Sequence, residues 1–270
     1  MLNSKQYRLL DVGGTYIKCA DGRQVPVSSD GNREVIAAAF KKAIGPTEGL
    51  KGIGVAIPGP FDFQGGVFHM EHKFASVKEL SFRELAQVPE NIELRFHHDV
   101  NALLLGAVRL LRLKNAALVT LGTGLGFTYA LDGKVQYNEK GSPARNLWNL
   151  PYGKGILEDV ISARGIRIAY ARKTGDAGQS AYTIAKLANA GVIPALEVYD
   201  NVGTLLGQAL QEVLQDISLD TLLIGGQIAK SLSLMIRPLQ NTLEGVSILP
   251  APGGAVFEGL SSLFESQTVK

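Results

Sequence analysis

Apolar runs and polar breaks alternate along the 270 residues of the chain. Short apolar stretches, several with period two, predict strands, and longer stretches with one apolar face predict helices. We expect strands at Tyr7–Val12, Thr15–Ala20, Gly52–Ile57, Ile92–Phe96, Ala116–Leu121, Phe127–Leu131 and Thr221–Ile224. We expect helices at Arg33–Ile44, Glu79–Gln87, Val100–Leu113 and about Ala255–Phe264, with a mainly helical region from Gly155 onward. This alternation predicts the α/β fold class.

One segment of the pattern occurs twice. Residues 9–22, LLDVGGTYIKCADG, resemble residues 118–133, LVTLGTGLGFTYALDG. Each copy is an apolar strand, a glycine-rich turn with a threonine, a second strand and then Asp-Gly, and the second copy has two extra residues in its turn. The similarity is either a chance likeness of two short hairpins or the trace of a duplication. A duplication predicts two similar halves that face each other, with their boundary near Lys114-Asn115.

Composition narrows the class of protein. Hydrophobic residues make up 46% and charged residues 19% of the chain, which is typical of a folded domain. The net charge of +2 and the scattered basic residues argue against a nucleic-acid or membrane partner. Cys19 is the single cysteine, so we expect no internal disulfide and a reducing compartment, the cytoplasm. No stretch approaches the roughly 20 apolar residues of a membrane helix, and the start of the chain does not read as a signal peptide.

Three glycine-rich turns are candidate phosphate sites. Glycine allows the backbone to come close to a ligand, and a concave row of N–H groups binds phosphate oxygens. Singly, each turn is more often an ordinary connection, but together they could clamp a nucleotide from opposite sides. The turns are Asp11-Val12-Gly13-Gly14-Thr15, Gly122-Thr123-Gly124-Leu125-Gly126 and Gly225-Gly226-Gln227. In the first turn, the carboxylate of Asp11 is suited to hold Mg²⁺ through water.

Two common nucleotide motifs are disfavoured. A dinucleotide-binding G-x-G-x-x-G must open a helix, whereas the residues after Gly126 alternate as a strand does. The sequence also contains no G-x-x-x-x-G-K-[ST] segment. Neither a dehydrogenase nor a P-loop enzyme is therefore expected.

Five segments in order carry a resemblance over nearly the whole chain. "DVGGTYIK", "GVAIPGPFD", "HDVNA", "LGTGLG" and "LIGGQIA" are similar in order and spacing to the ROK family of sugar kinases and repressors. The resemblance implies the hexokinase/actin-like fold: two actin-like (ribonuclease H-like) α/β domains with a cleft between them. We expect the domains at 1–113 and 114–270, with the helix at 255–265 a candidate to join the first. It also implies a kinase that uses ATP and Mg²⁺ on a sugar, and a homodimer.

The resemblance implies roles for the three turns. Asp11 matches the residue that assists the magnesium ion. The other matched positions contact the nucleotide: its phosphates at Gly13, Gly14 and Thr15, the transferring phosphate at Gly122, Thr123 and Gly124, and the adenosine at Gly225 and Gly226.

Asp99 matches the family's catalytic base, in a segment that the family writes Asn-Asp-x-Asn-Ala. A carboxylate beside the sugar hydroxyl would orient it and accept its proton, adding ~10²–10⁴-fold to the rate. The residues alone favour another reading, in which Asp99 is the N-cap of the helix that follows, and both roles can coexist. The resemblance implies sugar contacts for His98, Asn101, Glu158 and Gly59. At a helix start, Glu158 could equally be a surface acid favoured by the helix dipole.

Departures from the family pattern bear on the substrate. His98 replaces the usual asparagine, and the cysteine-rich zinc loop and the Glu-Ile-Gly-His element are not recognisable in 140–159, so we expect no zinc site. The replaced stretch, 138–155, carries Asn146, Trp148, Asn149 and Tyr152. These side chains could contact a sugar, or the stretch could be a packed loop that its Trp anchors. The sequence therefore leaves the sugar open.

Two other classes of function stay open. One is a sugar sensor without catalysis, although the family's repressors carry an N-terminal DNA-binding domain and this chain reaches its first predicted strand within about ten residues. The other is an actin-like ATPase or chaperone, which the "PGPFD" and "HDVNA" segments disfavour.

Overall fold

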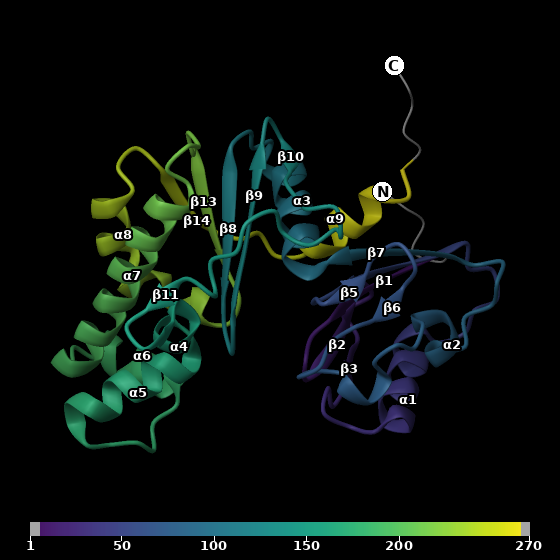
Figure 1. Cartoon of the computed structure of the whole chain (residues 1–270), viewed down its shortest axis with the longest axis horizontal. Helices are drawn as coiled ribbons and strands as arrows, with labels where there is room; N and C mark the ends of the chain where they lie inside the picture. The colour runs from purple at the N-terminus through teal and green to yellow at the C-terminus, as the bar shows by residue number, and fades with distance from the viewer. Residues whose placement is uncertain (1–5, 266–270) are drawn as a thin grey trace. The chain divides into compact units, whose positions relative to one another are not determined.

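The first sheet contains five strands. In the computed structural model, which describes residues 6–265, these strands lie in the order β3-β2-β1-β4-β7 (Figure 1). Strands β1, β4 and β7 run parallel, so their carboxyl ends meet at one edge, and β2 and β3 add antiparallel neighbours. The bounds are β1 Tyr7–Val12, β2 Tyr16–Cys19, β3 Gln24–Pro26, β4 Gly52–Ile57 and β7 Glu93–His98.

Helices and two short strands complete this part of the chain. They are α1 Arg33–Ile44, β5 Phe61–Asp62, β6 Val67–Phe68, the 3-10 turn η1 Ala75–Val77, α2 Phe82–Ala86, α3 Asp99–Leu111 and α9 Ala255–Ser262. Helices α3 and α9 touch backbone to backbone, because a Cβ at Gly106 would collide with the carbonyl of Ala255 and one at Gly259 with that of Ala102. The core includes the fully buried rings of Phe40, Phe68, Phe74 and Phe82.

The second sheet repeats the arrangement of the first. Its order is β10-β9-β8-β13-β14, again with three parallel strands and two antiparallel ones. The strands are β8 Ala116–Leu121, β9 Leu125–Leu131, β10 Lys134–Val135, β13 Thr221–Gly225 and β14 Ser247–Pro250. The hairpins β1–β2 and β8–β9 occupy equal places in the two sheets, which confirms the expected similarity of the two copies.

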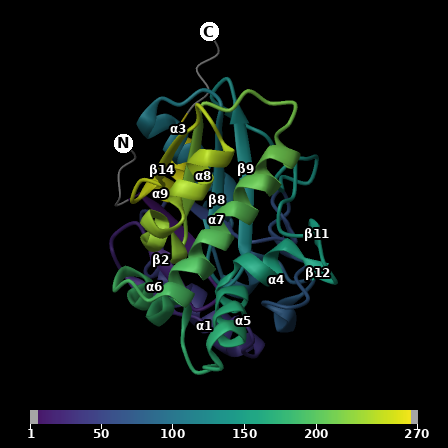
Figure 2. The same cartoon turned by 90° about the vertical axis from the view of Figure 1, so that its left-hand side faces the viewer.

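The rest of the second half is mainly helical, as the pattern predicts. Figure 2 shows helices α7 and α8 in front of the strands of this sheet. Between β10 and β14 lie β11 Pro151–Tyr152, β12 Gly155–Ile156, α4 Leu157–Ile161, α5 Ala163–Thr174, α6 Ala181–Asn189, α7 Ile193–Val213, the 3-10 segment η2 Ile228–Leu234 and α8 Ile236–Thr242.

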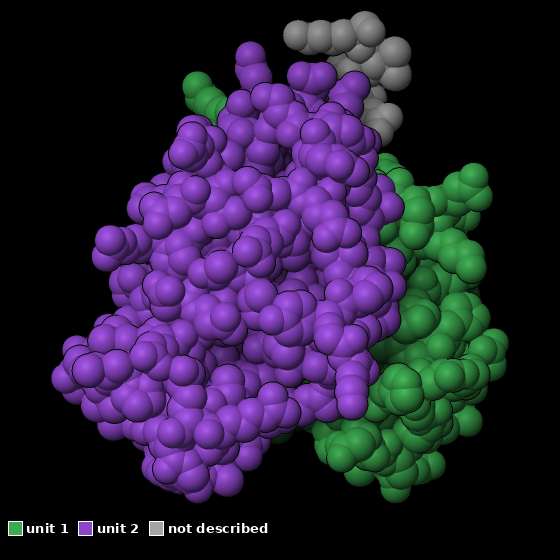
Figure 3. Space-filling model, turned by 60° about the vertical axis from the view of Figure 1, so that its left-hand side comes forward, with its two compact units in different colours: residues 1–112, 137–143, 252–270 green, residues 113–136, 144–251 purple. Residues whose placement is uncertain are grey.

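The chain divides into two compact units, which Figure 3 colours separately. Unit 1 holds the residues up to Arg112, the segment Tyr137–Pro143 and the residues from Pro252 onward. Unit 2 holds Leu113–Gln136 and Ala144–Ala251. Each unit has its own sheet and its own large cluster of buried apolar side chains. The chain crosses from one unit to the other four times, so the units are not two continuous halves of the sequence.

Some element boundaries differ from the predicted ones. The helix expected at Glu79–Gln87 is only α2, because Glu79 has a positive φ of 64° and the side chain of Ser81 caps the helix by accepting from the N–H of Glu84. Strand β7 continues to His98, beyond the predicted end at Phe96. Among residues 6–265, no helix combines the length and the apolar character that a membrane span needs.

Candidate functional site

The carboxyl edge of the first sheet gathers three of the predicted segments. In the register, Asp11 on β1 pairs with Ala56 on β4, and Ala56 pairs with His97 on β7. Two strand spacings separate β1 from β7, about 10 Å. The turn after β1, the Pro58-Gly59-Pro60 turn after β4 and Asp99 after β7 therefore lie at one edge of unit 1.

Asp11 is a half-buried carboxylate with one cationic partner. Its side chain is 20% exposed, and its Oδ2 lies 3.3 Å from Nζ of Lys18, its cross-strand neighbour on β2. Burial raises the pKa of Asp11, the charge of Lys18 lowers it and the charge of Asp99 raises it, with a net upward shift. A divalent cation bound between these two carboxylates would reduce their mutual repulsion.

The turn after β1 is open at its tip. The N–H of Gly13 donates to the carbonyl of Tyr16 at 3.0 Å, and Gly14 offers its carbonyl to the N–H of Ser29. Within residues 6–265, the N–H groups of Gly14 and Thr15 donate to no other group. Free backbone donors in a glycine turn can receive phosphate oxygens.

Asp99 is the first residue of α3, and its carboxylate is held in place. Its Oδ1 accepts from the N–H of Val100 at 2.8 Å and lies 2.8 Å from Nδ1 of His98. The N-cap interpretation of Asp99 is wrong by one position, because His98 occupies the N-cap and its side chain makes no capping bond. Asp99 still lies in the first turn, where the helix dipole favours a negative charge.

The pKa of Asp99 is shifted in the opposite direction from that of Asp11. Burial raises it, but the charge of His98, the contact with its ring and the N–H of Val100 lower it, and the charge of Lys73 adds to them. The net shift is downward. Asp99 is therefore ionised at neutral pH although only 35% of its side chain is exposed.

His98 is wedged between its neighbours. A Cβ at Gly59 would lie 3.5 Å from Cδ2 and Nε2 of its imidazole, so the glycine backbone packs directly on the ring. The ring centre lies 5.7 Å from that of Phe63, and 16% of the side chain is exposed. Nδ1 makes no well-directed hydrogen bond, so its contact with Asp99 is an ion-pair contact. Gly59 therefore helps to hold the His98 ring in place.

Asn101 is fully buried. Its Nδ2 donates to the carbonyl of Gly141 at 3.2 Å, and its Oδ1 has no partner among the described residues. Gly141 in turn packs against the ring of Phe63. In this structure Asn101 fastens the segment 137–143 to unit 1, and its predicted sugar contact stays a prediction.

Unit 2 contains the other two glycine turns and Glu158. Oε2 of Glu158, on α4, accepts from the N–H of Leu125 at 2.7 Å, and a Cβ at Gly124 would lie 2.9 Å from the same oxygen. The carbonyl of Gly122 accepts from the N–H of Ala163 at 2.8 Å. Glu158 is therefore neither a freely solvated surface acid nor remote from the turn: it braces the β8–β9 turn.

The third turn lies against the second. Gly225 is the register partner of Thr120, two residues before the β8–β9 turn. Gly226 has a φ of 84°, and a Cβ there would collide with the carbonyl of Leu121. The two turns are thus adjacent at the carboxyl edge of the second sheet, and only glycine fits at Gly226.

The replaced stretch exposes its aromatic side chains. Trp148 is 43% and Tyr152 is 42% exposed, whereas Leu147 is fully buried. The interpretation in which the Trp anchors a packed loop is therefore wrong, because Leu147 fills that position. The carbonyl of Trp148 accepts from the N–H of Glu158 at 3.1 Å, so the backbone of Trp148 lies next to that of Glu158.

Two lysines at the edge of unit 1 were not singled out from the sequence. The hairpin register that pairs Lys18 with Asp11 follows from an apolar strand joined to a period-two strand by a short turn, so this pair could have been predicted from the sequence. Lys73 lies in no predicted strand or helix, so its electrostatic effect on Asp99 could not be predicted from the sequence pattern. That effect arises only in the folded chain. Among residues 6–265, no three His, Cys, Asp or Glu side chains gather as a metal site.

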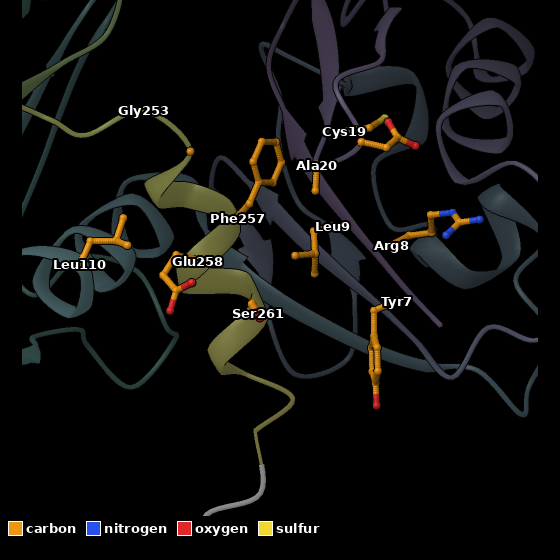
Figure 4. A pocket seen from close by; sticks show the side chains of 12 residues that line it. Tyr7, Arg8, Leu9, Cys19, Ala20, Leu110, Gly253, Phe257, Glu258 and Ser261 are labelled. Carbon is orange, nitrogen blue, oxygen red and sulfur yellow. The ribbon is translucent and has the colours of Figure 1, made fainter. Parts of the chain in front are cut away.

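Unit 1 also has a pocket of about 400 Å³, away from the edge that holds Asp11 and Asp99 (Figure 4). It is lined by the first residues of β1, the end of β2 and the face of α9 that carries Phe257 and Ser261. This is the opposite end of β1 from Asp11. Its two acids are already paired, Asp21 with Arg23 and Glu258 with Arg109. The pocket is therefore separate from the edge that holds Asp11 and Asp99.

Known proteins resemble the chain over nearly its whole length. A glucokinase of Halalkalibacterium halodurans is 24% identical over 300 residues, covering 95% of this chain and 90% of that protein. The crystal structure of a ROK family glucokinase from Streptomyces griseus in complex with glucose and AMPPNP matches with a TM-score of 0.75 and 19% identity, covering 94% of this chain and 97% of that one. A ROK family transcriptional regulator, a homologue of the E. coli MLC protein, matches with a TM-score of 0.75 and 19% identity, covering 97% and 82%.

These matches identify the fold as the two-part α/β fold of these proteins. The family profile itself matches residues 9–145, slightly more than half of the chain, and includes the β1–β2 turn, Asp99 and the β8–β9 turn. The chain belongs to the ROK family.

Proposed function

We propose that the protein is an ATP-dependent sugar kinase, which transfers the γ-phosphoryl group of Mg-ATP to a hydroxyl of a hexose or hexose derivative. The observation that carries this proposal is the pair of carboxylates of Asp11 and Asp99 at one sheet edge, beside the open Gly13-Gly14 turn. The likeness to a glucokinase that binds glucose and AMPPNP supports the choice of a sugar and ATP as substrates.

The glycine turns would hold the nucleotide. The free N–H groups of Gly14 and Thr15 are suited to its phosphates. The turn at Gly122, Thr123 and Gly124 would meet the transferring phosphate, and Gly225 and Gly226 would border the adenosine. Asp11 would hold Mg²⁺ through water, since its carboxylate lies at the same edge as the carboxylate of Asp99 and beside the open turn. The ion, when bound, neutralises charge on the phosphates.

Asp99 would orient the attacking hydroxyl. As the new bond from the sugar oxygen to phosphorus forms and the bond to the β-phosphate oxygen breaks, the hydroxyl proton passes to Asp99 and ADP leaves. The lowered pKa of Asp99 keeps it ionised but makes it a weak base. Positioning is therefore its main contribution, and proton transfer comes late, as a loose transition state allows.

The sugar would meet His98 beside Asp99. The ring is fixed by Asp99 and Gly59 and keeps 16% of its surface exposed. Sugar contacts of Asn101 and Glu158 require side chains that are engaged in this structure with Gly141 and Leu125. We therefore rank His98 first as a sugar contact. The homodimer and the cytoplasmic location stay predictions.

A sugar screen tests the proposal. An ATP-coupled assay with hexoses, amino hexoses and N-acetyl hexoses should reveal sugar-dependent ADP release. Asp99→Asn should lower kcat by about 10²–10⁴-fold without loss of helical circular dichroism. Asp200→Asn, an exposed acid on α7, is the matched control and should leave kcat unchanged. Undiminished turnover in Asp99→Asn would remove that residue from the reaction.

A sugar sensor without catalysis is the second candidate. Histidine in place of the usual asparagine before Asp99, and the likeness to a ROK transcriptional regulator, favour it. Calorimetry separates the two functions: a sensor binds a sugar but not Mg-ATP, whereas a kinase binds both.

A further inference from the structure

Lys73 lies in the segment of residues 69–78, between β6 and α2, which we call the strap. The backbone of the strap is held in place by its neighbours. Phe74, the next residue, is fully buried and has a φ of 56°. Its ring lies 6.1 Å from that of Phe40 and 6.0 Å from that of Phe68, and its N–H donates to the carbonyl of Ser29. The backbone that presents Lys73 is therefore anchored in the core of unit 1.

The strap is also tied to the first glycine turn. The hydroxyl of Ser76 donates to the carbonyl of Gly31 at 2.6 Å, and the N–H of Ser29 donates to the carbonyl of Gly14 at 3.2 Å. Residues 28–31 thus connect the strap to the turn that offers free N–H groups to a phosphate. A displacement of either segment would break these bonds.

The side chain of Lys73 passes over Gly14. A Cβ at Gly14 would lie 3.9 Å from Cε and 4.0 Å from Cδ of Lys73, at van der Waals distance, so the stem of Lys73 lies just beyond the space that a side chain at Gly14 would fill. Within residues 6–265 its ammonium group has no acidic partner within 4 Å, unlike Lys18 with Asp11 and Lys78 with Glu71. Lys73 is exposed, so the charge is available to a ligand of the turn.

A further cation at this edge would be favourable when a phosphate ligand binds there. This edge holds two acidic side chains, Asp11 and Asp99, and Lys18 is engaged with Asp11. A triphosphate brought to this edge adds several more negative charges. Preorganised cations aimed at the transferring group stabilise its charge in the transition state.

We propose that Lys73 is a phosphate-binding residue that contacts the γ-phosphoryl group of a nucleotide held at the Gly13-Gly14 turn. The inference rests on the proposed function of this edge as a nucleotide site. The plain alternative is a solvated surface lysine, whose charge acts on Asp99 only at a distance.

The test compares nucleotides that differ by the γ-phosphoryl group. Calorimetric affinities of Mg-ATP and Mg-ADP are measured for the wild type, Lys73→Met and Lys73→Arg. Lys78→Met, an exposed lysine of the same segment, is the matched control. Lys73→Met should lose about tenfold in affinity for ATP and little for ADP, Lys73→Arg should regain part of the loss, and Lys78→Met should match the wild type. In the sugar assay, Lys73→Met should lower kcat/KM for ATP by about 10²-fold.

The outcomes separate this inference from the proposed function. Wild-type affinity for ATP in Lys73→Met, or equal losses for ATP and ADP together with a lower Tm, overturns the role of Lys73. Preferential loss of ATP affinity in a protein that phosphorylates no sugar supports Lys73 and contradicts the kinase. A wild type that binds neither nucleotide overturns both.

Discussion

Nδ1 of His98 lies 2.8 Å from Oδ1 of Asp99, and the two residues join the end of β7 to the start of α3. The pair couples Asp99, the residue proposed to orient the sugar hydroxyl, to His98, which stands where the resemblance leads us to expect an asparagine. The charge of His98 and its contact with the carboxylate lower the pKa of Asp99, although burial raises it. The pH dependence of the proposed reaction should therefore depend on His98.

His98→Asn should move the acid limb of the kcat profile to higher pH. Without the imidazole, burial dominates and the pKa of Asp99 rises, so the carboxylate is protonated sooner as the pH falls. Turnover measured from pH 4.5 to 8 in the sugar assay checks this. His72→Asn, an exposed histidine, serves as control and should keep the wild-type profile. An acid limb that stays in place in His98→Asn contradicts the coupling.

His97 should make the protein less stable in mild acid. Burial lowers the pKa of His97, with a contribution from the charge of His98, to about 4 from the usual 6.5. The unfolded chain thus binds a proton more tightly than the folded one, so stability falls as the pH drops from about 6.5 towards 4. The full shift corresponds to about 3 kcal/mol.

His97→Gln removes this loss. Urea unfolding at pH 7.5 and 4.5 should show a smaller difference in free energy of unfolding for the variant than for the wild type. A control variant, His69→Gln, should retain the wild-type difference, because His69 is exposed beside Glu79. Equal differences in wild type and His97→Gln would show that the neutral state of His97 is not the cause.

Glu158→Ala should loosen the β8–β9 turn. The variant loses a charge-assisted acceptor for the N–H of Leu125, a change that costs about 1–3 kcal/mol when the donor is left without a partner. Thermal unfolding should show a lower Tm, and hydrogen exchange should become faster at Leu125. Glu158→Gln retains an acceptor oxygen and should fall between, and Glu244→Ala, an exposed acid, should match the wild type. Unchanged exchange at Leu125 would contradict the brace.

Gly226→Ala and Gly245→Ala form a matched pair. Both glycines have positive φ, 84° and 77°, but only at Gly226 would a Cβ meet another group, the carbonyl of Leu121. Gly245→Ala should cost about 1 kcal/mol of backbone strain, and Gly226→Ala at least about 2 kcal/mol, because the β13 turn must move away from β8. Chemical denaturation measures both. Equal costs would show that the close approach of the two turns is not needed for stability.

Much of the fold was predictable because its signals are local. Apolar runs place β1 and β8, and period-two runs place β2 and β9, nearly at their observed bounds, and Gly-Pro after Ile44 ends α1. The internal repeat predicts two similar sheets, which the matching strand orders confirm. The short strands β10 and β14 escaped detection, since two to four residues carry too little pattern.

The candidate site was predictable in part. Asp11 lies near the carboxyl end of one predicted strand and Asp99 follows another, and parallel strands bring such positions to one edge. The N-cap interpretation of Asp99 and the anchoring role of the Trp were wrong. The helix begins at Asp99 itself, one residue earlier than a cap at Asp99 would require, and Leu147, next to the Trp, is the buried residue.

By itself, the sequence determined the strands, the glycine turns and the order of the ROK segments, because these depend on neighbouring residues and on side-chain periodicity. Tertiary structure decided which distant groups meet: Glu158 with Leu125, Asn101 with Gly141, and Lys73 with Gly14. It also decided that 137–143 and the residues from Pro252 onward belong to unit 1. Such meetings depend on how whole elements pack, and packing is a property of the assembled cores that no short stretch of sequence encodes.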